Sequence, residues 1–409
     1  MNFNAFHFHP NVAAGIKAAG FVQPTPIQAR AIPSIMKGLD VMGTAQTGTG
    51  KTAAFVLPLL NRFRGKKRSR ILALIIAPTR ELAEQIHQEV CTLGRQSGLR
   101  SATVYGGVGF DQQVRKLKGG AEIIVACPGR LLDHMNRGYV DLGFLEALVL
   151  DEADQMFDMG FLPDIRKILR QTPRRRQTLL FSATMPAEIK RLASEALHQP
   201  VTVQVGNPAP ADTVSHVLYP VKQHAKTSLL LKLLRETQIR SALVFTRTKH
   251  RAKHLGEKLS KAGFRSTSLQ GNLSQSRRQA ALAGFRSGRF QILVATDIAA
   301  RGIDVSRVSH VINYDIPATG EAYIHRIGRT GRAKRRGEAL TLVTNEDKVL
   351  VRAIKRIVGS NMEQRILPDF GYRSAEAPAP SPNVSSKRPW KKRYKASGMP
   401  MRGNNNPYS

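Results

Sequence analysis

The sequence predicts two α/β domains in tandem, each built on a parallel sheet that helices cover on both faces. Short apolar runs alternate with helical patterns between residues 40 and 205, and the same alternation returns between residues 242 and 343. Continuous apolar strands separated by helices are typical of parallel sheets that are buried on both faces. A chain of 409 residues also suits two hydrophobic cores better than one.

Seven apolar runs of strand length define the first predicted domain, residues 1–206. The runs are residues 41–42, 71–77, 103–105, 123–126, 147–150, 178–181 and 201–205. Residues 207–215 are mostly polar or small and include prolines, so they predict a linker between the domains.

Four further apolar runs define the second predicted domain, residues 216–365. They are residues 242–245, 292–295, 308–312 and 339–343. Ala252, Leu255 and Leu259 keep helical spacing after the first of these runs, and Gly263 is placed to end that helix. This part of the chain carries no glycine-rich GxxxxGK[ST] pattern, so we expect no second nucleotide site.

The last predicted segment, residues 366–409, is a basic tail. Residues 371–409 contain six prolines and eight Lys or Arg residues against one Glu, with almost no large aliphatic side chains. Such a segment cannot bury enough apolar surface to offset the entropy lost on ordering, so we predict a disordered tail.

The formal net charge of +34 is the most unusual bulk property of the chain. An excess of this size repels itself unless a polyanion shares the surface, which makes nucleic acid the first partner to consider. Solubility alone would explain only a few surplus charges. An acidic membrane could also attract them, but no basic amphipathic helix with a bulky apolar face is evident.

Cysteine content and apolar run length indicate a cytoplasmic protein without membrane segments. Cys91 and Cys127 provide neither a disulfide framework nor a metal-ligand cluster. The first ten residues lack the pattern of a signal peptide, and the longest apolar runs are too short to span a bilayer.

A phosphate-binding loop is predicted at residues 45–52 (AQTGTGKT), between an apolar strand and a helical pattern. Its glycines let backbone N–H groups turn toward phosphate oxygens, and the following helix points its positive end at them. Lys51 would reach the β- and γ-phosphates of a nucleotide, and the Thr52 hydroxyl would face Mg²⁺. The other predicted nucleotide contacts of this loop are Thr47, Gly48, Thr49 and Gly50.

The acidic residues Asp151 and Glu152 directly follow the predicted strand that ends at Leu150, within the sequence VLDEAD at residues 149–154. Ligands of open α/β sheets bind at the carboxyl ends of strands, where Asp151 and Glu152 are placed. Asp151 is the predicted Mg²⁺ ligand, and Glu152 could align and deprotonate an attacking water. Together with the loop, these residues predict the hydrolysis of a nucleotide.

These two motifs resemble those of the DEAD-box family of ATP-dependent RNA helicases, and the resemblance covers residues 1–360. It implies two tandem RecA-like domains of the P-loop NTPase type. Residues 20–28 (GFVQPTPIQ) resemble the family's Q motif, in which Phe21 stacks on adenine and Thr25 and Gln28 recognise ATP. Without the neighbouring motif residues, Gln28 would be interpreted as a buried glutamine in a turn. The compact start, minimal core and short basic tail resemble the bacterial RhlE-like subgroup.

Further first-domain segments resemble the family's RNA-binding and coupling motifs. PTREL at residues 78–82, the glycine pair 106–107 and PGR at residues 128–130 imply contacts with RNA phosphates, and SAT at residues 182–184 implies coupling of ATP to strand separation. Cys127 stands where the family usually has Thr before PGR. A thiol is a weaker hydrogen-bond donor than a hydroxyl, so we expect one contact with an RNA phosphate to be weaker. The residues assigned by this resemblance are Pro78, Arg80, Gly107, Gly129 and Arg130 for RNA, and Ser182 and Thr184 for coupling.

The second domain carries the remaining motifs. HRIGRTGR at residues 325–332 implies that Arg329 and Arg332 contact the γ-phosphate from across the cleft, one of them as an arginine finger. His325 is expected to contact the acidic motif or the Ser-Ala-Thr motif of the first domain, and the alternative is a structural histidine. ATDIAARGID at residues 295–304 implies RNA binding by Thr296 and ATP binding by Gly302 and Asp304. The RNA side is completed by Arg247, Gly271 and the segment from Gln275 to Arg278.

The sequence therefore predicts an RNA-stimulated ATPase that binds RNA through its backbone and separates short duplexes. The expected cofactors are ATP and Mg²⁺, and the expected partner is RNA. Ribosome-assembly or RNA-decay proteins are further candidate partners, and we expect a monomer. Two alternatives stay open at this point: a DNA helicase on the same plan, and an ATP-gated RNA clamp that turns over rarely.

Overall fold

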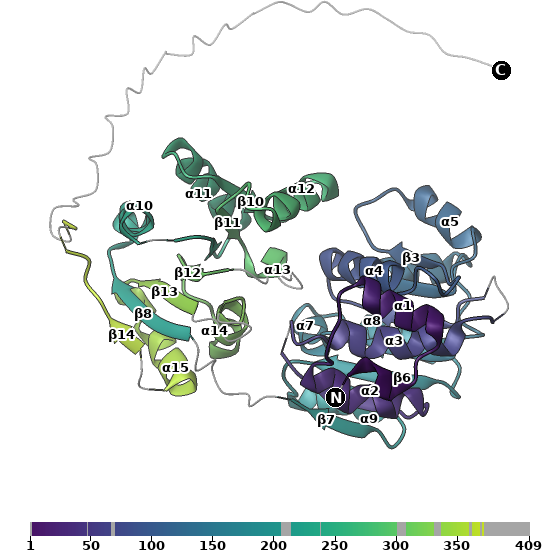
Figure 1. Ribbon diagram of the computed structural model, residues 1–409. Coiled ribbons are helices and arrows are strands. Elements are labelled where there is room, and N and C mark those ends of the chain that lie inside the picture. The colour runs from purple at the N-terminus through teal and green to yellow at the C-terminus, as the bar shows by residue number, and fades with distance from the viewer. Residues whose placement is uncertain are drawn as a thin grey trace, which may run out of the picture.

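The computed structural model describes residues 2–46, 48–66, 70–205, 214–237, 239–300, 308–330, 337–359, 362–368 and 370–371. Two α/β domains, purple to teal and teal to yellow in Figure 1, face each other. Most of the predicted linker and tail lies outside the described residues. In the described residues, no helix is long and apolar enough to cross a membrane.

The first domain alternates strands and helices from its first strand onward. Its elements are η1 (Phe3–Phe6), α1 (Pro10–Ala18), α2 (Pro26–Met36), β1 (Val41–Thr44), α3 (Lys51–Phe63), β2 (Ala73–Ile76), α4 (Arg80–Leu93), β3 (Ser101–Val104), α5 (Phe110–Lys118), β4 (Ile123–Ala126), α6 (Pro128–Asn136), β5 (Ala147–Leu150), α7 (Ala153–Asp158), α8 (Leu162–Arg170), β6 (Gln177–Ser182), α9 (Ala187–Ala196) and β7 (Val201–Gln204).

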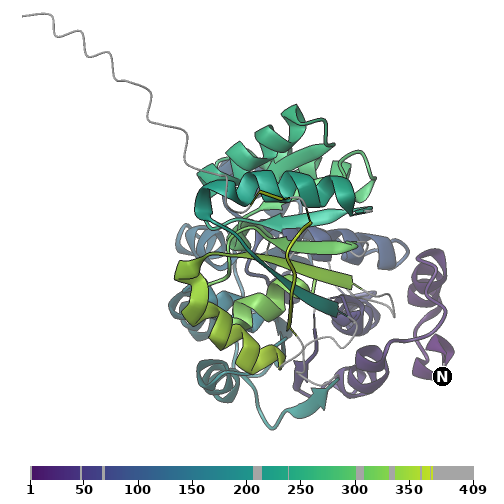
Figure 2. The same ribbon diagram turned by 90° about the vertical axis from the view of Figure 1, so that its left-hand side faces the viewer.

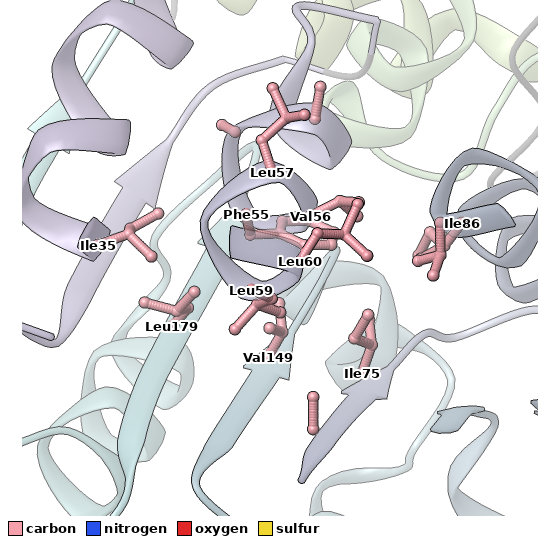
Figure 3. Close-up of a cluster of buried hydrophobic side chains, with 14 of the residues drawn as sticks. Ile35, Phe55, Val56, Leu57, Leu59, Leu60, Ile75, Ile86, Val149 and Leu179 are labelled. Carbon is pink, nitrogen blue, oxygen red and sulfur yellow. The ribbon is translucent and has the colours of Figure 1, made fainter. Parts of the chain in front are cut away.

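The sheet of this domain is parallel and has the strand order β3-β4-β2-β5-β6-β1-β7. Apolar clusters lie on both faces of it. The central helix α3 is buried along nearly its whole length, and Leu59 lies over Val149 and Leu179 of the sheet (Figure 3). Burial of α3 fixes its first residue, Lys51, at the carboxyl edge of the sheet.

The second domain repeats this alternation. Its elements are β8 (Val214–Pro220), η2 (Gln223–Ala225), α10 (Lys226–Glu236), β9 (Ala242–Phe245), α11 (Lys249–Lys261), β10 (Ser266–Leu269), α12 (Gln275–Arg286), β11 (Ile292–Ala295), α13 (Asp297–Ala300), β12 (His310–Asn313), α14 (Gly320–Ile327), β13 (Gly337–Val343), η3 (Asn345–Asp347), α15 (Lys348–Val358) and β14 (Met362–Gln364).

The second sheet is also parallel, with the order β10-β11-β9-β12-β13-β8-β14. If β8 to β14 are renumbered from one to seven, this order is identical to that of the first sheet. The two predicted parallel-sheet domains are therefore confirmed, and they share one topology. Figure 2 shows the second domain in front of the first, with its strands running side by side.

Three strands of the second sheet were not predicted. β8 begins at Val214, inside the predicted linker, because the proline-bearing stretch hid its start. β10 has the sequence STSL, whose small polar residues give no apolar run. β14 is a three-residue edge strand with two exposed polar residues. The predicted helix with Ala252, Leu255 and Leu259 is confirmed as α11, and Gly263 follows it with φ +91°.

Candidate functional site

The predicted phosphate-binding loop connects β1 to α3. Gly48 and Gly50 have φ of 82° and 94°, values that favour glycine. A Cβ on Gly50 would also lie 2.6 Å from the Gln28 Nε2 atom. The Lys51 ammonium folds back over the loop and donates to the Ala45 carbonyl at 2.8 Å. The N-terminus of α3 thus presents backbone N–H groups and a cation at one point, which suits an anion. Thr47 lies outside the described residues.

Asp151 and Glu152 follow β5 and are both 2% exposed. The Asp151 carboxylate accepts from the Glu152 backbone N–H at 3.0 Å. Glu152 adopts φ 54°, a left-handed conformation that is uncommon for a residue with a side chain and that recurs at functional sites. Burial raises the pKa of the Asp151 carboxyl to about 7, while nearby Lys51 lowers it. Because burial disfavours the charged form of the Asp151 carboxyl, a further cation beside it would stabilise that form.

One cavity of about 1030 Å³ brings Phe21, residues of the predicted phosphate loop and the acidic pair together. Its first-domain wall and its second-domain wall face each other across the gap between the domains. The first wall includes Phe21, Gly48, Gly50, Lys51, Thr52, Asp151 and Glu152, and the second includes Arg240, Arg265 and Arg286. The predicted loop and the predicted acidic pair therefore belong to one site that both domains enclose.

The predicted Q-motif residues lie beside this loop. The Phe21 ring stacks on Phe3, with ring centroids 5.9 Å apart. The Gln28 side chain accepts from the Thr25 backbone N–H at 2.9 Å and donates to the Gly50 carbonyl at 3.1 Å. Gln28 therefore couples the start of α2 to the phosphate loop, a positioning role that the sequence interpretation did not include. Its contact with adenine stays a prediction.

Asp154 is a central residue of the site that the sequence interpretation missed. Its Oδ2 accepts from the backbone N–H groups of Ala183 and Thr184, at 3.2 and 2.8 Å, and from the Thr184 hydroxyl at 2.9 Å. Its backbone N–H donates to the Ser182 hydroxyl at 3.1 Å. The His325 Nε2 atom lies 3.9 Å from the same Oδ2. Asp154 thus joins the acidic motif to Ser182, Thr184 and the second domain.

Arg329 and His325 lie at a second cavity between the domains, of about 460 Å³. Arg329 is 5% exposed. The first-domain wall of this cavity includes Ala45, Gln46 and Thr184, so Arg329 faces the beginning of the phosphate loop from the other domain. Arg332, Gly302 and Asp304 lie outside the described residues, and their predicted roles stay predictions.

The predicted RNA residues of the first domain follow three adjacent strands, β2, β3 and β4. The Arg80 guanidinium lies against Gly107, where a Cβ would approach Arg80 Nη1 to 1.9 Å, and Gly107 has φ 80°. Arg130 donates to the Val108 carbonyl at 3.2 Å. The glycine loop is thus held between two cations. Pro78 is buried. Gly129 faces open space, because a Cβ added there would meet no heavy atom of the described chain within 4 Å.

The predicted RNA residues of the second domain follow the equivalent strands β9, β10 and β11. Arg247 and Gly271 are exposed, and Thr296 is half-buried. The Arg247 backbone N–H donates to Asp315 Oδ2 at 2.8 Å, and the Arg247 side chain is at the surface. The structure therefore places both sets of predicted RNA residues after the corresponding strands of their two sheets.

Arg278 has a different role from the one predicted. Its Nε donates to the Glu81 carboxylate of the first domain at 2.6 Å, and its Nη1 donates to the Gln270 carbonyl at 3.3 Å. Both side chains are buried, with Arg278 9% and Glu81 6% exposed. The charge that the sequence interpretation assigned to RNA instead forms a buried ion pair between the domains.

Arg326 was also missed, although it lies within the HRIGRTGR motif. Its guanidinium binds both carboxylate oxygens of Asp297, at 2.6 and 2.7 Å, and donates to Asn313 Oδ1 at 3.0 Å and to the Asp315 carbonyl at 2.7 Å. It is 3% exposed. Arg326 therefore fixes α14, and with it His325 and Arg329, relative to α13 and Thr296.

Comparison with known proteins identifies the family. The DEAD/DEAH box helicase pattern matches residues 25–192, and the helicase conserved C-terminal domain pattern matches residues 225–334. The DEAD-box ATP-dependent RNA helicase CshA of Bacillus licheniformis is 44% identical over 90% of this chain and 76% of its own length. This chain belongs to the DEAD-box family of RNA helicases.

Other relatives agree. The ATP-dependent RNA helicase DeaD of Buchnera aphidicola is 41% identical over 91% of this chain, which spans 62% of that helicase. The structure of Saccharomyces cerevisiae Dbp5 bound to RNA and ADP·BeF₃ matches with a TM-score of 0.80 and 32% identity, covering 89% of this chain and 95% of Dbp5. The chain is thus an ATP-dependent RNA helicase and an RNA-stimulated ATPase with two RecA-like domains. Its RhlE-like subgroup stays a prediction.

Cys127 of this helicase occupies the N-cap position of α6 but makes no side-chain cap hydrogen bond. The residue is 9% exposed, and burial raises the pKa of its thiol to about 12. We expect Cys127→Thr to stabilise the first domain by about 1 kcal/mol, because a hydroxyl caps the N–H groups of the first helical turn. Thermal unfolding measures this. Cys91→Ser, at an exposed position within α4, is the control and should change stability by less than about 0.5 kcal/mol. An unchanged transition in Cys127→Thr would contradict the cap argument.

Proposed function

We propose that this helicase hydrolyses ATP in a pocket completed by its second domain, and that domain closure bends one RNA strand and releases its partner. The observation that carries the proposal is the shared cavity, with Lys51, Asp151 and Glu152 on one wall and the second domain on the other. Arg329, which faces the start of the phosphate loop in the neighbouring cavity, supports it.

In this proposal the first domain binds the nucleotide. The backbone of residues 47–50 and the Lys51 ammonium bind the phosphates, and Phe21, Thr25 and Gln28 bind adenine. Gln28 reports on occupancy of the base site through its hydrogen bond to Gly50. Gly302 and Asp304 would bind the ribose from the second domain.

Mg²⁺ fits the residues present. Thr52 supplies a hydroxyl at the first turn of α3, and Asp151 supplies a deeply buried carboxylate whose pKa burial raises. Oxygen ligands of this kind, one carboxylate together with substrate phosphates, are those that Mg²⁺ prefers. When bound, Mg²⁺ would neutralise charge on the phosphates.

Hydrolysis in this proposal uses residues from both domains. The Glu152 carboxylate orients the attacking water and accepts its proton. Arg329 and Arg332 stabilise the charge that develops on the transferred phosphoryl group. Ser182 and Thr184 sense the nucleotide through Asp154, which also lies near His325, so a shift at the acidic motif is passed to the second domain.

RNA binding in this proposal uses phosphate contacts in both domains. Arg80, Arg130, Gly107 and Gly129 would hold one part of the strand, and Arg247, Gly271 and Thr296 the other. Because both sets follow equivalent strands of the two sheets, a strand that contacts both must cross the gap between the domains. ATP and RNA would each favour the closed arrangement of the domains, so each should tighten binding of the other.

Arg80→Ala tests the RNA part of the proposal. We expect it to weaken RNA binding equally for unrelated sequences, and to lower the slope of log affinity against log salt by about 0.7, the value for one single-strand phosphate contact. Fluorescence anisotropy over a salt series, with a non-hydrolysable ATP analogue present, measures both quantities. The exposed Arg95→Ala variant should leave both unchanged. A sequence-dependent loss, or an unaltered slope in Arg80→Ala, would contradict the assignment.

We further propose a cytoplasmic location, which the free thiols of Cys91 and Cys127 support. The expected monomeric state and the ribosome-assembly or RNA-decay partners stay predictions of the sequence.

A further inference from the structure

The shared topology of the two sheets makes their surfaces comparable position by position. β8, β13 and β14 of the second sheet correspond to β1, β6 and β7 of the first, and α15 corresponds to α9. In each domain these elements surround a groove at the carboxyl ends of the strands. This edge of an open α/β sheet is where ligands bind.

In the first domain this groove faces a helix of the second domain, and a cavity of about 460 Å³ lies between the two. Its own wall comes from the ends of β1, β6 and β7 and from Lys190 of α9. The other wall comes from α14, through Ile324, His325, Gly328 and the adjoining Arg329. At this edge of the first domain the groove is thus covered by one helix.

The equivalent groove of the second domain has a volume of about 770 Å³ and no helix of the described chain lies across it. We name it the β8–α15 groove. Its apolar base includes the buried residues Leu218, Val221 and Val343. One wall is a stripe of α15 at helical spacing, namely Lys348, Val351, Arg352 and Lys355. In α15, which the structure describes throughout, Ile354 is the one buried residue, so its groove face is open.

The rim of the β8–α15 groove is basic. Lys222 and His224, which follow β8, also line the groove, and Glu346 is the one acidic residue among the lining side chains. Within the described part of the chain, no ion pair within 4 Å joins Lys348, Arg352 or Lys355 to a carboxylate. Three cations of α15 therefore line one wall beside the apolar base, and none of them forms an ion pair with a described carboxylate.

We propose that the β8–α15 groove is a docking site for an amphipathic helix of a partner protein, with aliphatic residues on one face and Glu or Asp on its flanks. The apolar base would receive the aliphatic side chains, as grooves receive i, i+3, i+4 and i+7 anchors in helix recognition. Charge complementarity with the basic rim selects an acidic helix.

Other occupants fit the groove less well. The chain's own residues 371–409 carry eight cations against one Glu, which the basic rim would repel. The α14 helix of a second copy is already engaged in its own interdomain cavity. RNA would find cations here, but no Phe, Tyr or Trp lines the groove to stack with bases, and its base is apolar. In Figure 1, β8 and β14 lie on the side of the second domain that faces away from the first.

Fluorescent peptides of about four helical turns test the proposal with the full-length protein. The first peptide carries Leu at i, i+3, i+4 and i+7 with flanking Glu, the second has Lys in place of Glu, and the third has the first peptide's composition in an order that breaks helical spacing. Arg352→Glu/Lys355→Glu removes the basic face. Arg356→Glu, a residue of α15 that does not line the groove, is the matched control.

We expect the acidic helical peptide to bind wild-type protein at least about tenfold more tightly than the other two peptides. The double variant should lose this binding by on the order of tenfold, while Arg356→Glu retains it. RNA binding and RNA-stimulated ATP hydrolysis should be unchanged in all variants, because the groove lies outside the shared cavity.

Equal binding of the acidic, basic and scrambled peptides would overturn the proposal, as would undiminished binding to the double variant. Loss of RNA affinity in the double variant, with peptide binding unaffected, would assign the groove to RNA instead. Circular dichroism of each variant separates loss of binding from loss of fold.

Discussion

Replacing Arg329 by alanine is expected to lower RNA-stimulated kcat for ATP hydrolysis by on the order of 10³-fold, the lower end of the effect of arginine fingers. Arg329 of the second domain is buried. It lines the same cavity as Ala45 and Gln46, which belong to the phosphate loop of the first domain. Its charge is therefore available to the phosphoryl group only when the domains are together. Phosphate release at saturating ATP and RNA measures the effect.

Two comparisons make this result specific. Arg329→Lys retains the charge but loses the planar fork, so its activity should lie between those of wild type and Arg329→Ala. Arg356→Ala removes an exposed cation of the same domain and should leave kcat unchanged. If Arg329→Ala retains wild-type kcat with a normal thermal transition, Arg329 does not act on the reaction.

Glu152→Gln is the second substitution with a very large expected effect. We expect kcat to fall by about 10²–10⁴-fold, because an amide cannot accept the proton of the attacking water. The neutral amide has nearly the same shape and suits a position that is 2% exposed, so the fold should persist. RNA binding in the presence of ATP should be retained, and release of a short duplex over many turnovers should be lost.

The matched control for Glu152→Gln is Glu146→Gln, at the surface of the same domain, where the carboxylate pairs with Arg62 and Lys66. Its kcat should stay within about twofold of wild type, because exposed ion pairs contribute little. Duplex release that survives in Glu152→Gln would show that turnover is dispensable, which is the behaviour of an ATP-gated clamp.

The fold could be predicted wherever burial on both faces made the strands apolar. Strands such as β5 and β11 are continuous aliphatic runs because helices cover them on both sides. β10 and β14 were missed because they lie at the two edges of the second sheet, where one side of the strand is unpaired and polar residues are tolerated. The identical order of the two sheets could not be predicted from runs of apolar residues, which contain no information on strand neighbours.

The candidate site could be predicted where chemistry demands particular residues at fixed spacing, as in the phosphate loop and the acidic pair. It could not be predicted where a residue's role depends on a distant partner. Arg278 looks like any phosphate-binding cation in the sequence, yet Glu81, 197 positions away, takes its charge. Asp154 and Arg326 lie inside recognisable motifs, but only the folded chain shows that they join motifs to one another.

The central claim is that closure of the two domains creates one pocket, and the buried Arg278–Glu81 pair is the contact that reports on closure most directly. The decisive measurement is the factor by which RNA tightens binding of a non-hydrolysable ATP analogue, in wild type, Glu81→Gln, Arg278→Gln and the swapped Glu81→Arg/Arg278→Glu variant. Coupling between sites is typically about 5–150-fold. Loss of one partner of a buried ion pair costs about 3–5 kcal/mol, enough to abolish such coupling.

We predict strong coupling in wild type, equal in both directions because linkage is reciprocal, with near-complete loss in each single variant and partial recovery in the swapped one. RNA that leaves the affinity for the nucleotide unchanged in the wild-type protein would contradict the shared pocket.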